Sequence, residues 1–173
     1  MKRIPGLLIV VVGLLLVGPS CTYKLSLNGA SIPPNMKTIK VDFFENNAAL
    51  VVNNLSTQFT EALKERIRNT TRLAIVTGDA DATMSGAITD YNIAPVSVNA
   101  TASNVVPIAG ASRLTITVQV KYVNNTEKKD SFDETFSKFQ DFSGDINTQE
   151  QTLIAAIDKQ LTEDIFNKAF ANW

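Results

Sequence analysis

The strongest constraint on the fold is the stretch 113–123, in which polar and apolar residues alternate. Its apolar positions are Leu114, Ile116, Val118, Val120 and Tyr122, and Thr115, Thr117, Gln119 and Lys121 lie between them. Successive side chains of a strand point to opposite faces, so this pattern predicts a strand with one buried and one solvated face. A sheet built from such strands needs a second layer to cover its apolar face.

Two segments with helical spacing can supply that layer. The first is 48–69, where apolar residues recur every four positions and Asn46 or Asn47 is the expected cap. This stripe consists of Val51, Leu55, Phe59, Leu63 and Ile67. The second begins with the capping-box pattern of residues 148–151 and is expected to continue to about Ala169. Both are predicted to be amphipathic helices that face the core.

Shorter β-type patterns surround the first helix. Residues 36–44 predict a half-buried strand with Ile39, Val41 and Phe43 on its buried side. Residues 72–77 are rich in β-formers. These two segments therefore add short strands to the sheet.

A long strand is predicted at 82–98, with a bulge at Gly86 and with Pro95 near an edge. The polar residues 124–130 fit a hairpin turn between the strand at 113–123 and a final strand.

Residues 131–142 provide that final strand and carry four phenylalanines. Their parity slips between Phe136 and Phe139. A bulge near Ser137 would account for the slip. The resulting order β-α-β-β-β-β-α predicts an α+β two-layer sandwich, with a mainly antiparallel four- to five-stranded sheet and two helices packed on one face.

The first 20 residues have the organisation of a secretory signal peptide. Lys2 and Arg3 precede the apolar stretch 4–17, and small or turn-forming residues at 18–20 come directly before Cys21. The alternative is an uncleaved membrane anchor, although a spanning helix needs about 20 apolar residues. Cleavage after residue 20 is the preferred interpretation.

Cys21 is the only cysteine of the chain, so it cannot form an intramolecular disulfide. Its position resembles the bacterial lipobox, except that Gly18 stands where leucine is usual. We therefore predict lipidation of Cys21, the alternative being a chance cysteine beside an ordinary cleavage site. The predicted organisation is a signal peptide at 1–20, a lipidated N-terminus and linker at 21–35 and a single domain at 36–173.

The composition argues against several classes of function. The net charge is −1 and no basic patch is evident, so no nucleic-acid partner is expected. The chain contains no histidine, and no metal-ligand spacing, phosphate-binding loop or dinucleotide fingerprint occurs. Asp79 and Asp81 fit a turn and strand edge better than a catalytic pair. We expect a protein that is not an enzyme and needs no cofactor or metal.

Candidate binding residues are few. The connection 94–112 is long and carries the apolar residues Val105, Val106, Pro107 and Ile108, which predict either a partner-contact loop or a mobile hairpin tip. Arg113 and Lys121 lie on the polar side of the clearest strand and could meet an anionic ligand. Their default interpretation is two cations that face water.

Several stretches also carry a resemblance to a known family. They are Cys21-Thr22-Tyr23, Ser31-Ile32-Pro33-Pro34, Thr38-Ile39-Lys40-Val41, Arg113-Leu114-Thr115-Ile116-Thr117-Val118, Phe136-Ser137-Lys138-Phe139, Asp164-Ile165-Phe166-Asn167 and Asn172-Trp173. Together they resemble the LptE family of lipopolysaccharide-assembly lipoproteins, in particular the form found in Bacteroidetes. The resemblance covers nearly all of the chain after Cys21.

The resemblance implies a partner role at the outer membrane. A protein of this kind would be held at the periplasmic face by palmitate-type acyl chains and would act as plug and assembly partner of the LptD β-barrel. It would support lipopolysaccharide transport to the outer leaflet and could bind lipopolysaccharide itself, through Arg113 and Lys121. The alternatives are a stand-alone periplasmic lipoprotein that binds a lipid or small ligand, and an enzyme with Asp/Glu or Ser/Lys chemistry.

Overall fold

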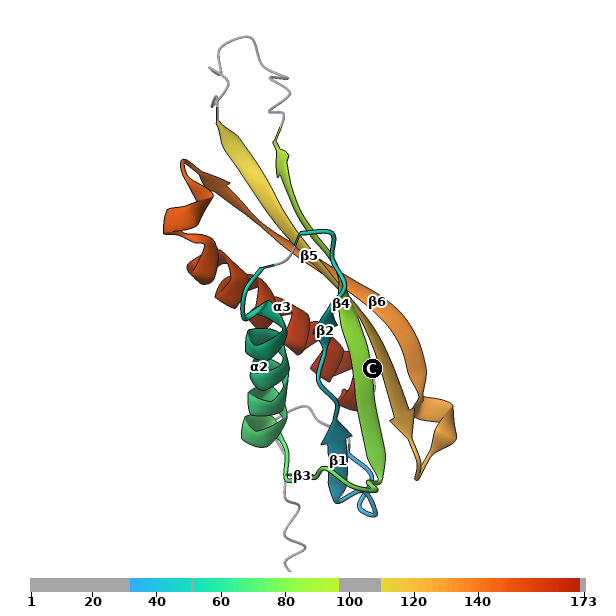
Figure 1. The fold of residues 1–173 in the computed structure, drawn as a ribbon. Helices are drawn as coiled ribbons and strands as arrows, with labels where there is room; N and C mark the ends of the chain where they lie inside the picture. The colour runs from blue at the N-terminus through green and yellow to red at the C-terminus, as the bar shows by residue number, and fades with distance from the viewer. Residues whose placement is uncertain (1–31, 51, 97–109, 172–173) are drawn as a thin grey trace, which may run out of the picture.

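The computed structural model describes residues 32–50, 52–96 and 110–171. Figure 1 shows two layers, a sheet and a pair of helices. The strands are β1 (Thr38–Val41), β2 (Glu45–Asn46), β3 (Ala74–Ile75), β4 (Ala82–Pro95), β5 (Ala111–Asn124) and β6 (Phe132–Ser143). The helices are α2 (Leu55–Thr70) and α3 (Glu150–Phe170), and the 3-10 turns are η1 (Lys128–Asp130) and η2 (Ile146–Thr148).

The sheet has six strands in the order β3-β1-β4-β5-β6, with β2 also paired to β4. The long pairs β4–β5 and β5–β6 are antiparallel, whereas the short strands β1, β2 and β3 form parallel pairs. Parallel strands need a crossover connection, and α2 provides it between β1 and β3. The predicted α+β two-layer class is confirmed, in a mixed and mostly antiparallel sheet with one strand more than expected.

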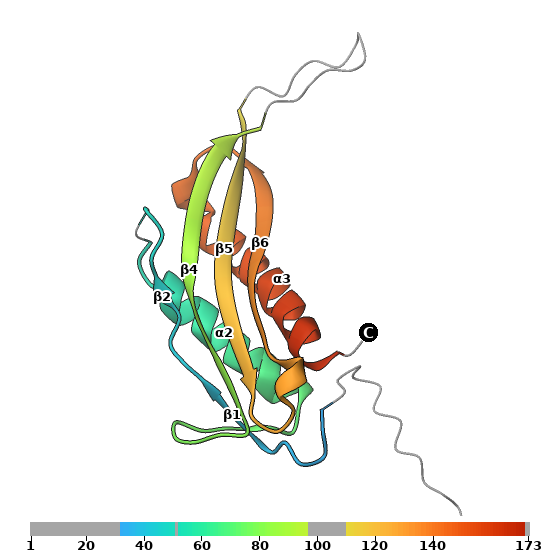
Figure 2. The same ribbon diagram turned by 90° about the vertical axis from the view of Figure 1, so that its right-hand side faces the viewer.

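Strand β5 follows the predicted alternation. All five of its apolar positions are buried beneath the helices. The helical stripes complete this core through Leu55, Phe59, Leu63 and Ile67 of α2 and Ile154, Ile157, Leu161 and Ile165 of α3. Figure 2 shows both helices behind the sheet, so the prediction of two helices on one face is confirmed.

The first helix begins later than predicted. It starts at Leu55 rather than at residue 48, and neither Asn46 nor Asn47 caps it. Asn46 belongs to β2, and its side chain closes a turn by accepting the Ala48 N–H at 3.0 Å. Pairing with β4 therefore outweighs the helical periodicity in this segment. Val51, the first member of the predicted stripe, lies outside the described residues.

The burial of the first strand also differs from the prediction. Phe43 is 56% exposed, whereas Phe44 is fully buried and packs edge-on against Phe59 with ring centroids 5.1 Å apart. Strand β1 ends at Val41, so the two-residue period does not continue to residue 43. The Phe44 N–H instead donates to Thr60 Oγ1 of α2 at 3.1 Å.

Both predicted bulges are wrong. Gly86 pairs with Val120 in unbroken register, and the irregularity of β4 lies between Ile88 and Asp90. The β5–β6 register is also unbroken, so no bulge occurs at Ser137. The phenylalanine parity slips because Phe139 lies on the other face of the sheet from Phe136.

The capping box predicted for the second helix does not form. Thr148 belongs to η2, and the residue that precedes α3 is Gln149, whose side chain makes no capping bond. The Asp145 carboxylate accepts the Asn147 N–H at 3.0 Å, so it caps the 3-10 turn instead. The helix itself ends at Phe170, one residue after the predicted end.

Asp81 has a structural role, as its turn-like context predicts. Its Oδ2 accepts hydrogen bonds from the backbone N–H groups of Lys37 and Thr38 at 2.8 and 2.9 Å, and from Thr38 Oγ1 at 2.9 Å. The bond from the Lys37 N–H, followed by those from Thr38, lowers the pKa of this carboxyl. These bonds hold the start of β1 against the start of β4.

Candidate functional site

The side of the sheet away from the helices forms a polar surface, which we call the open face. It exists because the side chains of β5 alternate, so its polar positions and the residues in register with them on β4 and β6 lie on the side of the sheet that Figure 2 shows in front. Its central members are Thr83 and Ser85 on β4, Arg113, Thr115, Thr117, Gln119 and Lys121 on β5, and Asp133, Thr135, Ser137, Phe139 and Asp141 on β6.

One end of the open face carries a cluster formed by Arg113, Phe139 and Asp141. The Arg113 guanidinium donates to both carboxylate oxygens of Asp141, at 2.7 and 3.0 Å, and lies 3.7 Å from the centroid of the Phe139 ring. The hydrogen bond raises the pKa of Arg113 and lowers the pKa of Asp141. Arg113 is therefore a fixed, partly neutralised cation. A phosphate that approached it would have to share the guanidinium with Asp141.

In the middle of the open face, polar side chains of β5 and β6 form hydrogen bonds with one another. The hydroxyl groups of Thr117 and Ser137 are hydrogen-bonded at 3.0 Å, and Gln119 Nε2 donates to Asp133 Oδ1 at 3.1 Å. Such cross-strand pairs stabilise the sheet. This part of the surface is polar without carrying an excess of positive charge.

Lys121 lies at the other end of the open face. It is exposed, it pairs in register with Ser85 and Asp133, and it forms no ion pair within the part of the chain that the structure describes. Eight residues of one strand separate it from Arg113, which corresponds to about 26 Å. The two predicted ligand-binding cations share a face but are not brought together into one pocket.

The remaining predicted site residues lie outside the described residues. Cys21 precedes residue 32, and Val105, Val106, Pro107 and Ile108 belong to the segment 97–109. Strand β4 ends at Pro95 and β5 begins at Ala111, so the connection between them is shorter than the predicted 94–112. The residues at both ends of the predicted connection belong to the strands of the hairpin.

Sequence reasoning did not identify Phe139 and Asp141 as partners of Arg113. Phe139 could have been found, because the parity slip can be explained without a bulge if one phenylalanine faces away from the core. Phe139 is 48% exposed, one of few large apolar side chains with that exposure in the described part of the protein. Asp141 could not have been found, because its contact depends on the strand register.

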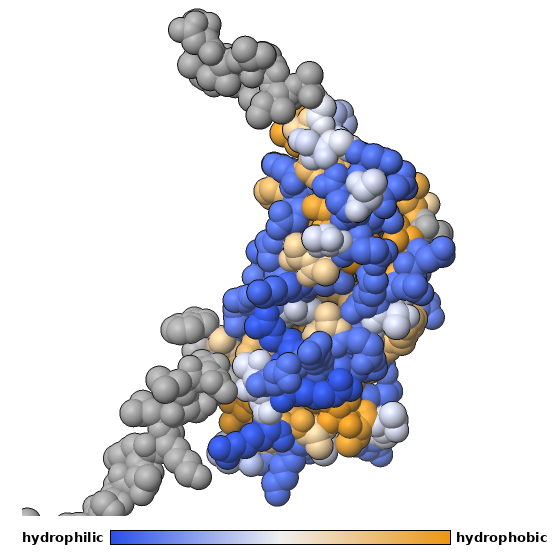
Figure 3. Space-filling model, turned by 90° about the vertical axis from the view of Figure 1, so that its left-hand side faces the viewer, coloured by the Kyte–Doolittle hydropathy of each residue, from blue (hydrophilic) through white to orange (hydrophobic). Residues whose placement is uncertain are grey.

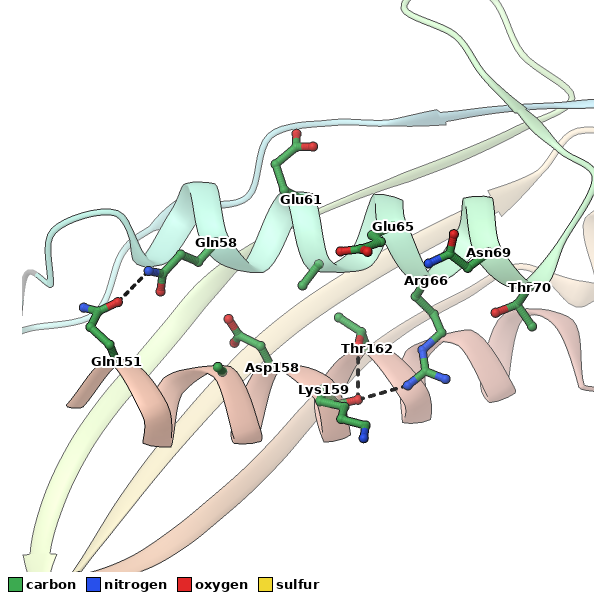
Figure 4. A pocket seen from close by; sticks show the side chains of 12 residues that line it. Gln58, Glu61, Glu65, Arg66, Asn69, Thr70, Gln151, Asp158, Lys159 and Thr162 are labelled. Atoms are coloured by element: carbon green, nitrogen blue, oxygen red, sulfur yellow. Dashed lines mark hydrogen bonds between the residues drawn. The ribbon is translucent and has the colours of Figure 1, made fainter. Parts of the chain in front are cut away.

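A second site was missed altogether. A cavity of about 720 Å³ lies between α2 and α3, on the side away from the sheet (Figure 4). A hydrogen bond of 2.6 Å between the side chains of Gln58 and Gln151 crosses the space at one end. Toward the other end, Arg66 Nη2 crosses from α2 to the Lys159 carbonyl oxygen at 3.5 Å and to Glu163 at 3.4 Å. We call this space the α2–α3 hollow.

Asp158 lies in the α2–α3 hollow and is 2% exposed. Its Oδ1 has no hydrogen-bond partner within the described residues. Burial raises the pKa of this carboxyl to about 7. Asp158 is adjacent to the apolar stripe of α3, and its sequence pattern alone does not separate it from an exposed helical aspartate.

Among the described residues, neither a metal-ligand cluster nor a membrane-spanning helix is present. They contain no group of three or more Asp, Glu, His or Cys side chains that could hold a metal ion. None of their helices is long and apolar enough to cross a membrane.

The sequence matches a family model over most of its length. The model is that of LptE, described as Lipopolysaccharide-assembly, and it matches residues 36–169. No curated protein sequence matches the chain.

Solved structures that are similar to the chain come from several bacteria. The hypothetical protein CT253 from Chlamydia trachomatis has a TM-score of 0.55 and 10% identity, over 79% of this chain and 99% of that chain. The rare lipoprotein B from Shewanella oneidensis has a TM-score of 0.47 and 12% identity, over 74% and 91% of the two chains. A minor lipoprotein from Acinetobacter baumannii has a TM-score of 0.44 and 14% identity, over 77% and 91%. At these identities the likeness to CT253 concerns the fold alone.

Proposed function

Because the chain belongs to the LptE family of lipopolysaccharide-assembly lipoproteins, we propose that it is the plug and assembly partner of an LptD-type outer-membrane β-barrel. The family match over residues 36–169 is the observation that carries the proposal. Membership also makes the role non-enzymatic, which confirms the prediction from the missing catalytic motifs. The Bacteroidetes form of the family stays a prediction.

The open face suits a protein that is enclosed by a partner. It is polar, and several of its side chains are hydrogen-bonded to one another, so water or a polar lumen can cover it at little cost. Arg113 and Phe139 offer a stacked, partly exposed pair at one end, a combination enriched at protein interfaces. Val105, Val106, Pro107 and Ile108, in the segment that joins β4 to β5, would extend the contact beyond the described residues.

Extraction of outer membranes in mild detergent tests the partner role. Affinity capture of the full-length protein should recover a β-barrel of much larger mass, identified by mass spectrometry. Serine at Val105, Val106 and Ile108 should reduce the barrel recovered. A protein captured repeatedly without any barrel would contradict the proposal and favour a stand-alone ligand-binding lipoprotein.

Lipidation of Cys21 places the protein at the periplasmic face of the outer membrane in this proposal. We expect the Cys21→Ser variant to carry no acyl chains, because serine has no thiol to which they could be attached. Since stable anchoring takes at least two acyl chains, the variant should leave the membrane fraction. The intact mass of the purified protein checks this: the wild-type chain should begin at residue 21 and carry acyl groups. An unmodified Cys21 in a membrane-bound protein would contradict the proposal.

Arg113 and Lys121 are our candidates for contact with lipopolysaccharide phosphates. Replacing both with glutamate should weaken lipopolysaccharide binding about tenfold, since each loses a charge-assisted hydrogen bond. The matched control is Arg68→Glu with Arg72→Glu, which reverses one cation in the last turn of α2 and one just after the helix. Binding of labelled lipopolysaccharide, with circular dichroism to check folding, provides the measurement. Equal loss in both double variants, or no loss in either, would remove Arg113 and Lys121 from the binding site.

A further inference from the structure

The walls of the α2–α3 hollow are two matching stripes of side chains. They are Gln58, Ala62, Glu65 and Asn69 on α2, and Gln151, Ala155, Asp158 and Thr162 on α3. In each stripe an alanine follows the bonded glutamine by four residues, and a carboxylate follows the alanine by three. Because the helices run side by side in the same direction in Figure 4, the two alanines leave room between the helices and the two carboxylates flank it.

Asp158 is the group that points to a ligand. A buried carboxylate normally has a hydrogen-bonding or charged partner, because its desolvation is costly. Asp158 is only 2% exposed, which means that 98% of it is buried, yet its Oδ1 has no partner among the described residues. Figure 4 shows its carboxylate directed into the space facing α2. The terminal torsion of aspartate is soft, so either oxygen can turn toward a donor there.

The cations near the hollow do not supply that donor. Arg66 bonds to the Lys159 carbonyl oxygen and to Glu163. Lys64 pairs with Glu61 at 2.8 Å. The side chain of Lys159 lines the hollow, but in Figure 4 its ammonium group points away from Asp158. No described cation near the hollow therefore pairs with Asp158, and its carboxylate is available to a donor from another molecule.

We propose that the α2–α3 hollow binds a lysine side chain of a partner polypeptide, whose ammonium group donates to Asp158. Lysine has an apolar stem, which can pack against the two alanines of the hollow, and a compact ammonium group with three donors, which can reach the carboxylates next to them. The volume of about 720 Å³ exceeds that of one side chain, so it also has room for part of the chain that carries the lysine. The side that carries the helices is mainly hydrophilic in Figure 3, which fits recognition by charge. This inference does not depend on the partner being a barrel.

Peptide binding to the full-length protein in detergent tests this site. The probe is the acetylated and amidated pentapeptide Ala-Ala-Lys-Ala-Ala, and its neutral counterpart has norleucine at the centre. We expect saturable binding of the lysine peptide in a nuclear magnetic resonance titration, with shifts at Ala62 and Ala155. The norleucine peptide should bind at least tenfold more weakly.

Three variants locate the binding. Asp158→Asn keeps the shape and should weaken the lysine peptide about tenfold, and Ala155→Leu should abolish binding by filling the hollow. Asp164→Asn is the matched control, because this aspartate of the same helix pairs with Lys138 at 2.7 Å and does not line the hollow. It should bind the peptide as the wild-type protein does. Circular dichroism confirms that each variant is folded.

Several results would overturn the proposal. These are absence of binding to the folded wild-type protein, equal affinity for the norleucine peptide, or unchanged affinity in Asp158→Asn. Binding of n-butylammonium as tight as that of the peptide would also overturn it, since the site would then recognise a small amine rather than a polypeptide. Barrel recovery from membranes is a separate readout, so failure here leaves the proposed assembly role intact.

Discussion

The Asp158→Asn variant is expected to be more stable than the wild-type protein at pH 8 and about equally stable at pH 4. Burial raises the pKa of Asp158 from 3.8 to about 7. Between these values the folded protein holds a proton that the unfolded chain has released, so wild-type stability falls as the pH rises through this window. Above pH 7 the folded protein carries the buried charge in full. Asparagine has no charge to bury.

The shift of Asp158 corresponds to at most about 4 kcal/mol at pH 8, with each pKa unit contributing about 1.4 kcal/mol. Urea unfolding followed by circular dichroism at a series of pH values measures it. The wild-type free energy of unfolding should fall between pH 4 and 7 relative to that of Asp158→Asn. The control is Asp164→Asn, whose partly exposed ion pair should change stability by at most about 1 kcal/mol. Parallel pH profiles for wild type and Asp158→Asn would contradict the prediction.

The Gly86→Ala substitution is expected to destabilise the protein by about 3 kcal/mol or more. A Cβ at this position would lie 2.0 Å from the Gln119 carbonyl oxygen and 2.7 Å from Phe44 Cε1. The first obstacle is backbone of the neighbouring strand β5 and cannot move without disturbing the ladder between β4 and β5. The second is a fully buried ring that is held against Phe59.

A matched glycine is available outside the sheet. Gly78 has no atom within 4 Å of an added Cβ, and Gly78→Ala should change stability by at most about 1 kcal/mol. Chemical denaturation of both variants gives the comparison. If Gly86→Ala unfolded at the same denaturant concentration as Gly78→Ala, the close approach of β4 to Phe44 would be disproved.

Asp158 connects stability with the inferred binding site. An unpaired buried carboxylate lowers stability at neutral pH, whereas a bound ammonium group would recover part of that free energy. A lysine peptide should therefore raise the wild-type melting temperature at pH 8 and leave that of Asp158→Asn nearly unchanged. A purely structural Asp158 would give no such difference between the two proteins.

Local patterns were sufficient for the elements and their buried faces. The alternation of β5 and the stripes of α2 and α3 depend on the periods of strand and helix, which are properties of neighbouring residues. These periods identified the core residues of all three elements and hence the α+β class. They failed where a tertiary contact competes with them, as at Asn46, which pairs with β4 instead of capping a helix.

Partners across the fold were decided by the tertiary structure. A period tells which face a residue occupies but not what lies opposite, so the parallel pairing of β1 with β3 and β4 had no counterpart in the sequence pattern. The contact of Arg113 with Asp141 depends on the β5–β6 register.

The amino-acid pattern was enough to predict the long strands, the two helices with the buried stripes of α2, α3 and β5, and the resemblance that the family match bears out. The packing of the folded chain was needed to show that Phe139 lies outside the core, that Gly86 is packed against another backbone, and that Asp158 Oδ1 is buried with no partner among the described residues. Hydrophobic periodicity is a local property of the chain, whereas desolvation, close packing and hydrogen-bond satisfaction depend on atoms brought together from distant parts of it.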